Sequence, residues 1–161
     1  MRRIVKAMRK VIYLRDQSNF KRYINSLLEE VDFTPIVNTV PKNIKSITFV
    51  IPGMPAFSGG HTSILRLGTE LSKRGYDVGY VSFAPQNIDD MKKNAEINLA
   101  NYKGSILGDD ITKVKSDIVI ATSWESLYYS RKISGYKMYF IQDYEPYFNL
   151  YGESYIMAQK S

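Results

Sequence analysis

Short, uninterrupted apolar runs recur along residues 46–161, and a stretch with helical periodicity follows nearly every run. Runs of this kind are typical of strands that are buried on both faces of a sheet. We expect strands at residues 47–51, 77–83, 104–107, 117–121 and 136–142. We expect helices at residues 62–74, 88–102, 123–134 and 151–161. The alternation predicts an α/β fold in which a Rossmann-like parallel sheet carries helices on both faces.

The positive charge of the chain is concentrated at its start. The whole chain has a net charge of +6, but its first 22 residues carry eight basic side chains and one acidic side chain, a net charge of +7. The rest of the chain is therefore close to neutral and lacks the basic face that nucleic-acid binding requires, so we expect no nucleic-acid partner. We predict a basic helical extension with a linker over residues 1–45, and a folded domain over residues 46–161.

The basic extension alternates apolar residues, at helical spacing, with cations. Its longest uncharged run is far shorter than the ~20 residues that span a bilayer. A basic amphipathic helix suits the surface of an anionic membrane, so we expect peripheral membrane contact through residues 1–30. Docking on the folded body and a transit peptide are the alternatives. The cations expected at the membrane are Arg2, Arg3, Lys6, Arg9 and Lys10.

A second, separate helix is expected after this arm. Ser18 is a suitable N-cap, and apolar residues at helical spacing follow it as far as Val31. Residues 33–46 contain two prolines and several polar residues, which indicates an extended connector.

The loop after the first strand of the folded domain is rich in glycine. Ligands of such sheets bind beyond the carboxyl ends of the strands, and glycine lets a ligand approach the backbone closely. Gly53, Ser58, Gly59 and Gly60 are therefore candidates for contact with a phosphate group, because the next helix begins here. A purely structural turn is the alternative. The loop has neither GxGxxG nor GK[ST] spacing, so a nicotinamide or flavin cofactor and an ATPase are poorly supported.

His61 is the single histidine, and the chain has no cysteine. It is either a donor to a sugar hydroxyl or phosphate oxygen, or a histidine that only caps the loop. One histidine without a neighbouring carboxylate makes neither a catalytic triad nor a metal site, and we expect no metal.

Trp124, the single tryptophan, follows the fourth strand. Its ring is a suitable stacking surface for a sugar or a base. The alternative is that it seals its helix against the sheet.

Acidic, amide and aromatic side chains crowd together after the last strand. Carbohydrates offer hydroxyls to polar groups and C–H faces to aromatic rings, so this composition favours sugar binding. Asp143 lies closest to the end of the strand among the acidic residues, whereas Glu145 is also placed to cap a turn. A hydrolase with two acting carboxylates needs a spatial gap that the sequence does not define. The candidates are Gln142, Asp143, Tyr144, Glu145 and Tyr147.

Two segments resemble a known family. The Gly-Gly loop of residues 53–61 is followed by a helix that closes on residues 71–78, LSKRGYDV, and this order resembles the N-terminal half of GT-B glycosyltransferases. Residues 139–148, YFIQDYEPYF, are similar to a stretch of bacterial rhamnosyltransferases of the S-layer-glycan and rhamnan type, related to glycosyltransferase family 4. The resemblance covers roughly residues 46–161.

The resemblance implies a retaining, metal-independent transferase that needs no cofactor. Its donor would be a nucleotide sugar, dTDP-L-rhamnose, and its acceptor a growing cell-surface glycan, for example a lipid-linked one at the inner face of the cytoplasmic membrane. The loop with Gly59 and Gly60 would lie at the donor phosphates. Asp143 and His61 would be catalytic, and Trp124 with the segment after the last strand would contact the acceptor or sugar.

This chain departs from the family because it stops at Ser161, without a donor-binding C-terminal domain. We therefore expect that domain to be absent here and the chain alone to be inactive. The main alternative is a non-catalytic Rossmann-like module that binds a glycan, a nucleotide or a partner protein. A small nucleotide-dependent enzyme, such as a reductase, is a third hypothesis.

Overall fold

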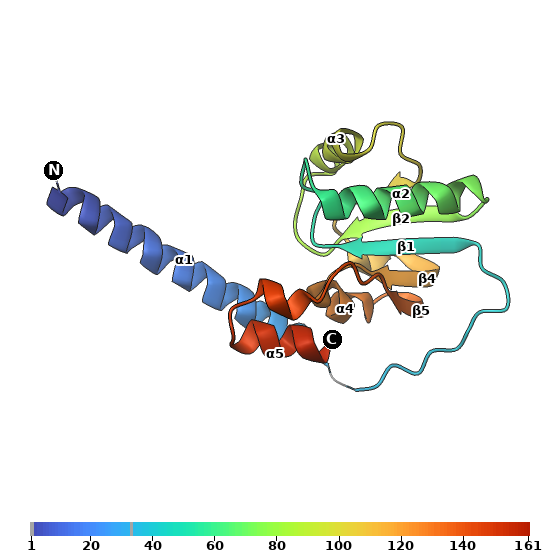
Figure 1. Ribbon diagram of the computed structural model, residues 1–161. Helices are drawn as coiled ribbons and strands as arrows, with labels where there is room; N and C mark the ends of the chain where they lie inside the picture. Colours follow the sequence, from blue (N-terminus) through green and yellow to red (C-terminus); the bar gives the residue numbers. More distant parts are fainter. Residues whose placement is uncertain (1, 33) are drawn as a thin grey trace. The chain divides into compact units, whose positions relative to one another are not determined.

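The computed structural model describes residues 2–32 and 34–161, and the side chains of the first helix from Arg15 onward. The chain divides into two compact units, Met1–Phe33 and Thr34–Ser161. The second unit contains the whole sheet and all the residues predicted for the strand-end site (Figure 1).

The first unit is one helix, α1, which runs without interruption from Arg2 to Glu30. The prediction of a separate helix beginning at Ser18 is wrong, because Ser18 lies inside α1. No proline or glycine interrupts this stretch, and serine caps a helix only where the preceding residue has left the helical conformation. Among the residues described, none of the helices combines the length and the apolar character needed to cross a bilayer. The side chains predicted at the membrane lie outside the described residues; they are Arg2, Arg3, Lys6, Arg9 and Lys10.

Five parallel strands form the sheet of the second unit, in the order β3-β2-β1-β4-β5. This arrangement confirms the predicted Rossmann-like α/β fold. Apolar residues fill most of β1 and the second half of β4, which is why these central strands are buried there. The strands are β1 (Ser46–Ile51), β2 (Asp77–Ser82), β3 (Ser105–Ile106), β4 (Lys115–Ala121) and β5 (Ser134–Tyr139).

Helices cover both faces of the sheet, as predicted: α2 and α3 lie on one face and α4 on the other (Figure 1). Ser123 is the N-cap of α4, as expected, and Ser126 completes a capping box with it. Two helices end before their predicted ends: α3 ends at Asn98, where the backbone becomes extended at Leu99, and α4 ends at Ser130. The helices are α2 (Gly59–Lys73), α3 (Ile88–Asn98), α4 (Trp124–Ser130) and α5 (Glu153–Lys160), with 3-10 turns η1 (Ile111–Lys113) and η2 (Glu145–Phe148).

The core has two layers because side chains alternate between the faces of each strand. Phe49 and Tyr80 stack on the face covered by α2, with ring centroids 5.6 Å apart. Val50 and Val119 lie on the opposite face. Gly68 of α2 is required here, because a Cβ at this position would lie 2.1 Å from the Tyr80 hydroxyl.

The connector before β1 is extended, as predicted, and it is bonded to the sheet. The side-chain amide of Asn38 accepts from the backbone N–H of Lys137 and donates to its carbonyl, both at 2.9 Å. Asp117 of β4 accepts from the backbone N–H groups of Lys45 and Ser46. These bonds explain why the second unit begins at Thr34, earlier than the boundary at residue 45 that the sequence suggested.

Candidate functional site

The strand order reverses between β1 and β4, so the chain leaves these two neighbouring strands in different directions. In open α/β sheets the crevice at such a point, beyond the carboxyl ends of the strands, is where ligands bind. At this edge the loop of residues 52–58 follows β1, and Thr122 follows β4. Thr122 is fixed there, because its hydroxyl donates to the carbonyl of Val50 at 2.7 Å.

Two amide side chains, one after β2 and one in α3, hold the first half of this loop in place. The Gln86 amide accepts from the backbone N–H of Met54 at 2.6 Å and donates to the Met54 carbonyl at 3.1 Å. Asn94 donates to the same carbonyl at 2.8 Å. Both the backbone N–H and the backbone carbonyl of Met54 are therefore hydrogen-bonded, as they would be in a strand, although Met54 lies in a loop.

Asn98 performs the same task for the second half of the loop. Its amide donates to the carbonyl of Pro55 at 2.7 Å, and its oxygen accepts from the backbone N–H of Ser58 at 2.9 Å. Asn94 and Asn98 were not predicted from the sequence. Their spacing of four residues places them on one side of α3, and this periodic amide pair is the signal that could have indicated them.

Two residues of the loop have left-handed backbone conformations. Gly53 has φ +125°, which glycine adopts without strain, and Phe57 has φ +56°. A left-handed phenylalanine costs on the order of 1–2 kcal/mol, so neighbouring bonds must hold it there. The Phe57 ring is 90% exposed, beside the start of α2.

Ser58 and His61 close the loop onto α2. Ser58 is the N-cap, and its hydroxyl lies 2.8 Å from His61 Nδ1. His61 Nε2 lies 2.8 Å from the carbonyl of Gly53, which can only accept, so Nε2 carries the proton and Nδ1 accepts from Ser58. Burial lowers the pKa of His61 below its ordinary value of 6.5, although the bond to Gly53 acts in the opposite direction. His61 is thus a neutral side chain that links the two ends of the loop by its hydrogen bonds to Ser58 and Gly53.

The glycine-rich loop and the segment after β5 meet at Gly60. A Cβ placed on Gly60 would lie 3.2 Å from Oε1 of Gln142, whereas a Cβ placed on Gly59 would meet no atom within 4 Å. Gly60 therefore makes room for Gln142, and Gly59 faces open space. The structure brings these two predicted segments together at the carboxyl edge of the sheet.

Glu145 ties the segment after β5 to α4. Its Oε2 accepts from the backbone N–H of Trp124 at 2.7 Å, and its Oε1 accepts from the Tyr139 hydroxyl at 2.9 Å. Burial, followed by the charge of Glu145, raises the pKa of Tyr139. Trp124 is 5% exposed and offers no ring face to a sugar, so in this structure it seals α4, the alternative weighed above.

Asp143 and two aromatic residues near it remain open to solvent. Asp143 is exposed, and its Oδ1 accepts from the backbone N–H of Tyr144 at 2.7 Å. Tyr144 and Tyr147 are 44% and 78% exposed. Among the described residues, no hydrogen bond joins Asp143 to His61, so these two predicted catalytic groups do not act as a bonded pair here.

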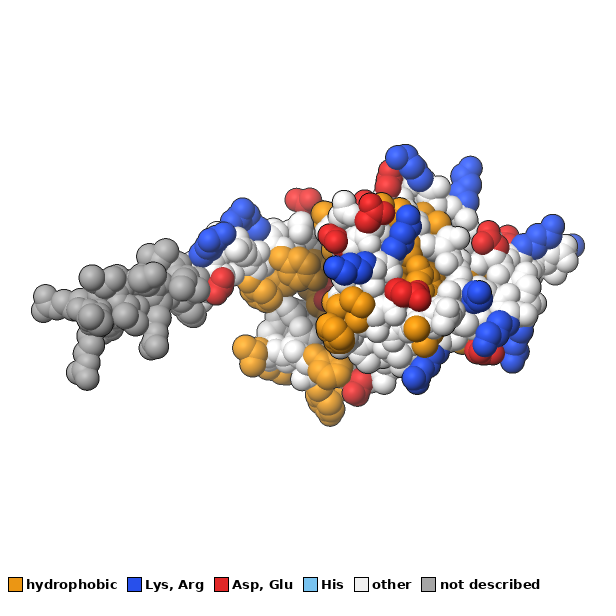
Figure 2. All heavy atoms as spheres, turned by 90° about the horizontal axis from the view of Figure 1, so that it is seen from above, with side chains coloured by type: hydrophobic (Ala, Val, Ile, Leu, Met, Phe, Trp, Pro, Cys, Tyr) orange, Lys and Arg blue, Asp and Glu red, His pale blue; other side chains and the backbone are white. Residues whose placement is uncertain are grey.

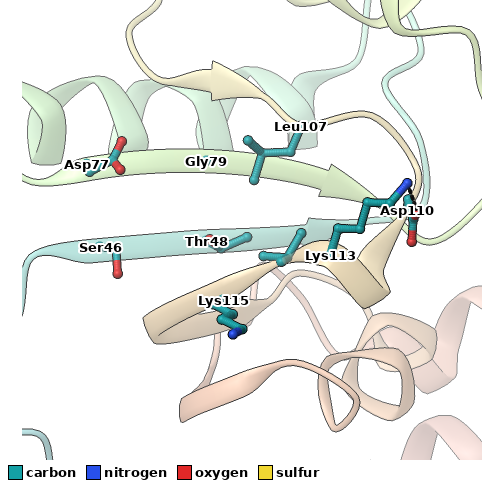
Figure 3. A pocket seen from close by; sticks show the side chains of 9 residues that line it. Ser46, Thr48, Asp77, Gly79, Leu107, Asp110, Lys113 and Lys115 are labelled. Carbon is teal, nitrogen blue, oxygen red and sulfur yellow. Dashed lines mark ion pairs between the residues drawn. The ribbon is translucent and has the colours of Figure 1, made fainter.

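A pocket of about 410 Å³ lies on one face of the sheet, away from these residues (Figure 3). It opens over the first halves of β1 and β2, next to an ion pair of 2.8 Å between Asp110 and Lys113. None of the predicted site residues lines it. Within the part of the chain that the structure describes, no group of three or more His, Asp or Glu side chains could hold a metal ion.

The sheet order and the parallel crossovers define an α/β protein of Rossmann-like fold. No protein-family model matches the sequence, and a search of curated proteins finds no significant match. The function therefore has to be argued from the site itself.

Proposed function

We propose that this chain is the acceptor-side domain of a GT-B glycosyltransferase, a rhamnosyltransferase that transfers L-rhamnose from dTDP-L-rhamnose to a growing cell-surface glycan. The observation that carries the proposal is the approach of Gly60 to Gln142. It joins the glycine-rich loop after β1 to the acidic and aromatic segment after β5. These are the two segments in which the sequence resembles the family, and they lie at the edge where such sheets bind ligands.

The glycine-rich loop supplies the phosphate side of the proposed site. The amino end of α2 carries a partial positive charge, and Gly59 leaves open space in front of it. Gly53 and Ser58 shape this loop, Gly53 through its left-handed turn and Ser58 as the N-cap. In the proposed enzyme, the loop stabilises the charge that develops on the leaving diphosphate.

The segment after β5 supplies the sugar side. Asp143 is exposed at the end of the strand, where its free carboxylate oxygen can accept from a sugar hydroxyl. Gln142 lies between Asp143 and the loop, so it can bond to a ligand that spans both. Placement of the acceptor hydroxyl against the donor carbon is then the main catalytic contribution of this domain. His61 supports it by fixing the loop rather than by direct proton transfer.

The basic start of α1 is proposed to hold the enzyme at an anionic membrane, close to a lipid-linked acceptor. α1 is one helix of 29 residues, long enough to present its first turns independently of its last ones. In a variant in which Arg2, Arg3, Lys6, Arg9 and Lys10 are all glutamine, affinity for phosphatidylglycerol vesicles in co-sedimentation should fall by about three orders of magnitude at low salt, because about 1 kcal/mol is lost for each cation. Equal binding of both proteins would contradict this role.

The experiment that tests the function is a transfer assay on the protein together with its donor-binding half. The enzyme is incubated with dTDP-L-rhamnose and a rhamnose oligosaccharide, and the oligosaccharide is weighed by mass spectrometry. The proposal predicts products that are heavier by one deoxyhexose. Binding of the oligosaccharide without any product, from this donor or from other nucleotide sugars, would instead support the non-catalytic binding module.

A further inference from the structure

Four tyrosines in the segment that runs from the end of β5 into α5 form what is called the tyrosine cluster below: Tyr144, Tyr147, Tyr151 and Tyr155. The ring centroids of Tyr144 and Tyr147 are 4.8 Å apart, and those of Tyr151 and Tyr155 are 4.9 Å apart. The two pairs are brought together because α5, which carries Tyr155, packs against η2, which carries Tyr147. Lost solvation, and then the neighbouring phenol groups, raise the pKa of Tyr155.

The cluster is open to solvent rather than part of the core. Tyr147 is 78% exposed and Tyr151 is 87% exposed, and Phe148 beside them is 72% exposed. Hydrophobic side chains reach the surface of the protein in patches between charged ones (Figure 2). Rings of this size are usually covered in soluble proteins, so a patch of them marks a binding surface.

The cluster stands on a fixed support. α5 packs against η2, and it is bonded to α4 because the Tyr128 hydroxyl donates to the carbonyl of Met157 at 3.1 Å. Met157 and Ala158 of α5 are buried. Glu145, at the start of η2, is bonded to α4 as described above. The rings are therefore presented by anchored elements, which reduces the entropy that a ligand loses in ordering them.

The chemistry of the cluster favours a neutral ligand with both hydroxyls and C–H faces. Residues 138–159 contain no lysine or arginine, whereas Asp143, Glu145 and Glu153 are acidic. This segment itself therefore offers no cation to a phosphate, a nucleic acid or an anionic lipid. A sugar chain fits, because its C–H faces stack on aromatic rings while phenol groups donate to and accept from its hydroxyls.

We propose that the tyrosine cluster is an extended carbohydrate subsite, which binds sugar units of a neutral glycan away from its reacting end. It is continuous with the strand-end site, because Tyr144 directly follows Asp143. The inference rests on the proposed function only in taking the glycan to be the acceptor. The surface would grip a chain of several sugars and bind a single sugar weakly.

The test is an NMR titration of the protein, with labelled tyrosine rings, against a linear L-rhamnose tetrasaccharide and against rhamnose alone. We expect the ring signals of the four tyrosines to shift with the tetrasaccharide, and to shift much less with rhamnose. Tyr151→Ala should weaken tetrasaccharide binding about tenfold, the loss expected for one stacking contact, and Tyr151→Phe by less than about threefold. Because the titration uses the unaltered protein, it decides the question even if a variant fails to fold.

Leu150→Ala is the matched control, since Leu150 is 94% exposed next to the cluster but has no ring. We expect it to leave tetrasaccharide binding unchanged. Tyrosine signals that do not shift at ~10 mM tetrasaccharide would overturn the inference, because a dissociation constant above that concentration is too weak for a useful subsite. So would sedimentation that shows copies of the chain associating through this surface and separating in Leu150→Ala. Transfer without these shifts removes the subsite alone, whereas shifts without transfer remove the proposed enzyme alone.

Discussion

The carboxylate of Glu145 accepts a hydrogen bond from the backbone N–H of Trp124 at 2.7 Å. This bond places a negative charge at the start of α4, where the helix dipole favours it. It also fixes the chain beyond β5, because the second oxygen of Glu145 holds the Tyr139 hydroxyl at 2.9 Å. The position of Asp143 and Tyr144, at the edge of the candidate site, therefore depends on a carboxylate that does not face the ligand.

Replacement of Glu145 by alanine should destabilise the domain by about 1–3 kcal/mol, because the N–H of Trp124 and the hydroxyl of Tyr139 lose a charged acceptor. Glu145→Gln should cost less, since its amide can accept from Trp124 and donate to Tyr139. Urea unfolding measures both changes. Glu153→Ala, at the exposed start of α5, is the control and should cost below about 0.5 kcal/mol. Equal costs for Glu145→Ala and Glu153→Ala would show that the bonds contribute nothing.

Asn98→Ala should loosen the glycine-rich loop without unfolding the sheet. The change removes the donor to Pro55 and the acceptor for Ser58, so backbone amides of the loop, including that of Ser58, should exchange with solvent faster. Two-dimensional NMR after transfer to D₂O measures the exchange. Lys93→Ala, at an exposed position on the same helix, is the comparison. If the loop amides exchange at the same rate in both variants, the hydrogen bonds of Asn98 do not hold the loop.

His61 should titrate below pH 6.5. Burial disfavours its charged form, so the folded protein binds this proton less readily than the unfolded chain does. The contribution of His61 to the free energy of unfolding should therefore be constant above pH 6.5 and should decrease as the pH falls below that value. Because the chain has a single histidine, its ring proton signal reports the pKa without ambiguity. A titration midpoint of the His61 ring at or above pH 6.5 would contradict its burial between Ser58 and Gly53.

The sequence pattern was sufficient for the sheet, because apolar residues dominate β1 and the second half of β4, and glycine or proline follows several of the strands. The cap at Ser123 was equally clear, since serine at that position has a local hydrogen bond to make. The break expected at Ser18 failed for the opposite reason: a possible cap does not end a helix when no proline or glycine stops it.

The roles within the site depended on long-range contacts that spacing does not encode. Gln86 follows β2, and Asn98 is the last residue of α3. Both hold the loop by hydrogen bonds, although they lie far from it in the sequence. Trp124 is buried, and no local pattern distinguishes a sealing ring from a stacking one. The meeting of Gly60 and Gln142 follows from strand order, which the sequence limits to few topologies but does not determine.

The proposed function is tested most directly by the rate of rhamnose transfer in Asp143→Asn, measured with the donor-binding half present and compared with Asp77→Asn. Both changes remove one exposed carboxylate charge, Asp143 at the carboxyl edge of the sheet and Asp77 at the opposite edge, beside the pocket of Figure 3. Asparagine can keep the bond to the N–H of Tyr144, so the fold should be unchanged. We expect transfer to fall at least about tenfold in Asp143→Asn, a barrier higher by about 1.4 kcal/mol, and to be unaltered in Asp77→Asn. Transfer at the normal rate in Asp143→Asn, or a loss confined to Asp77→Asn, would contradict the proposed function.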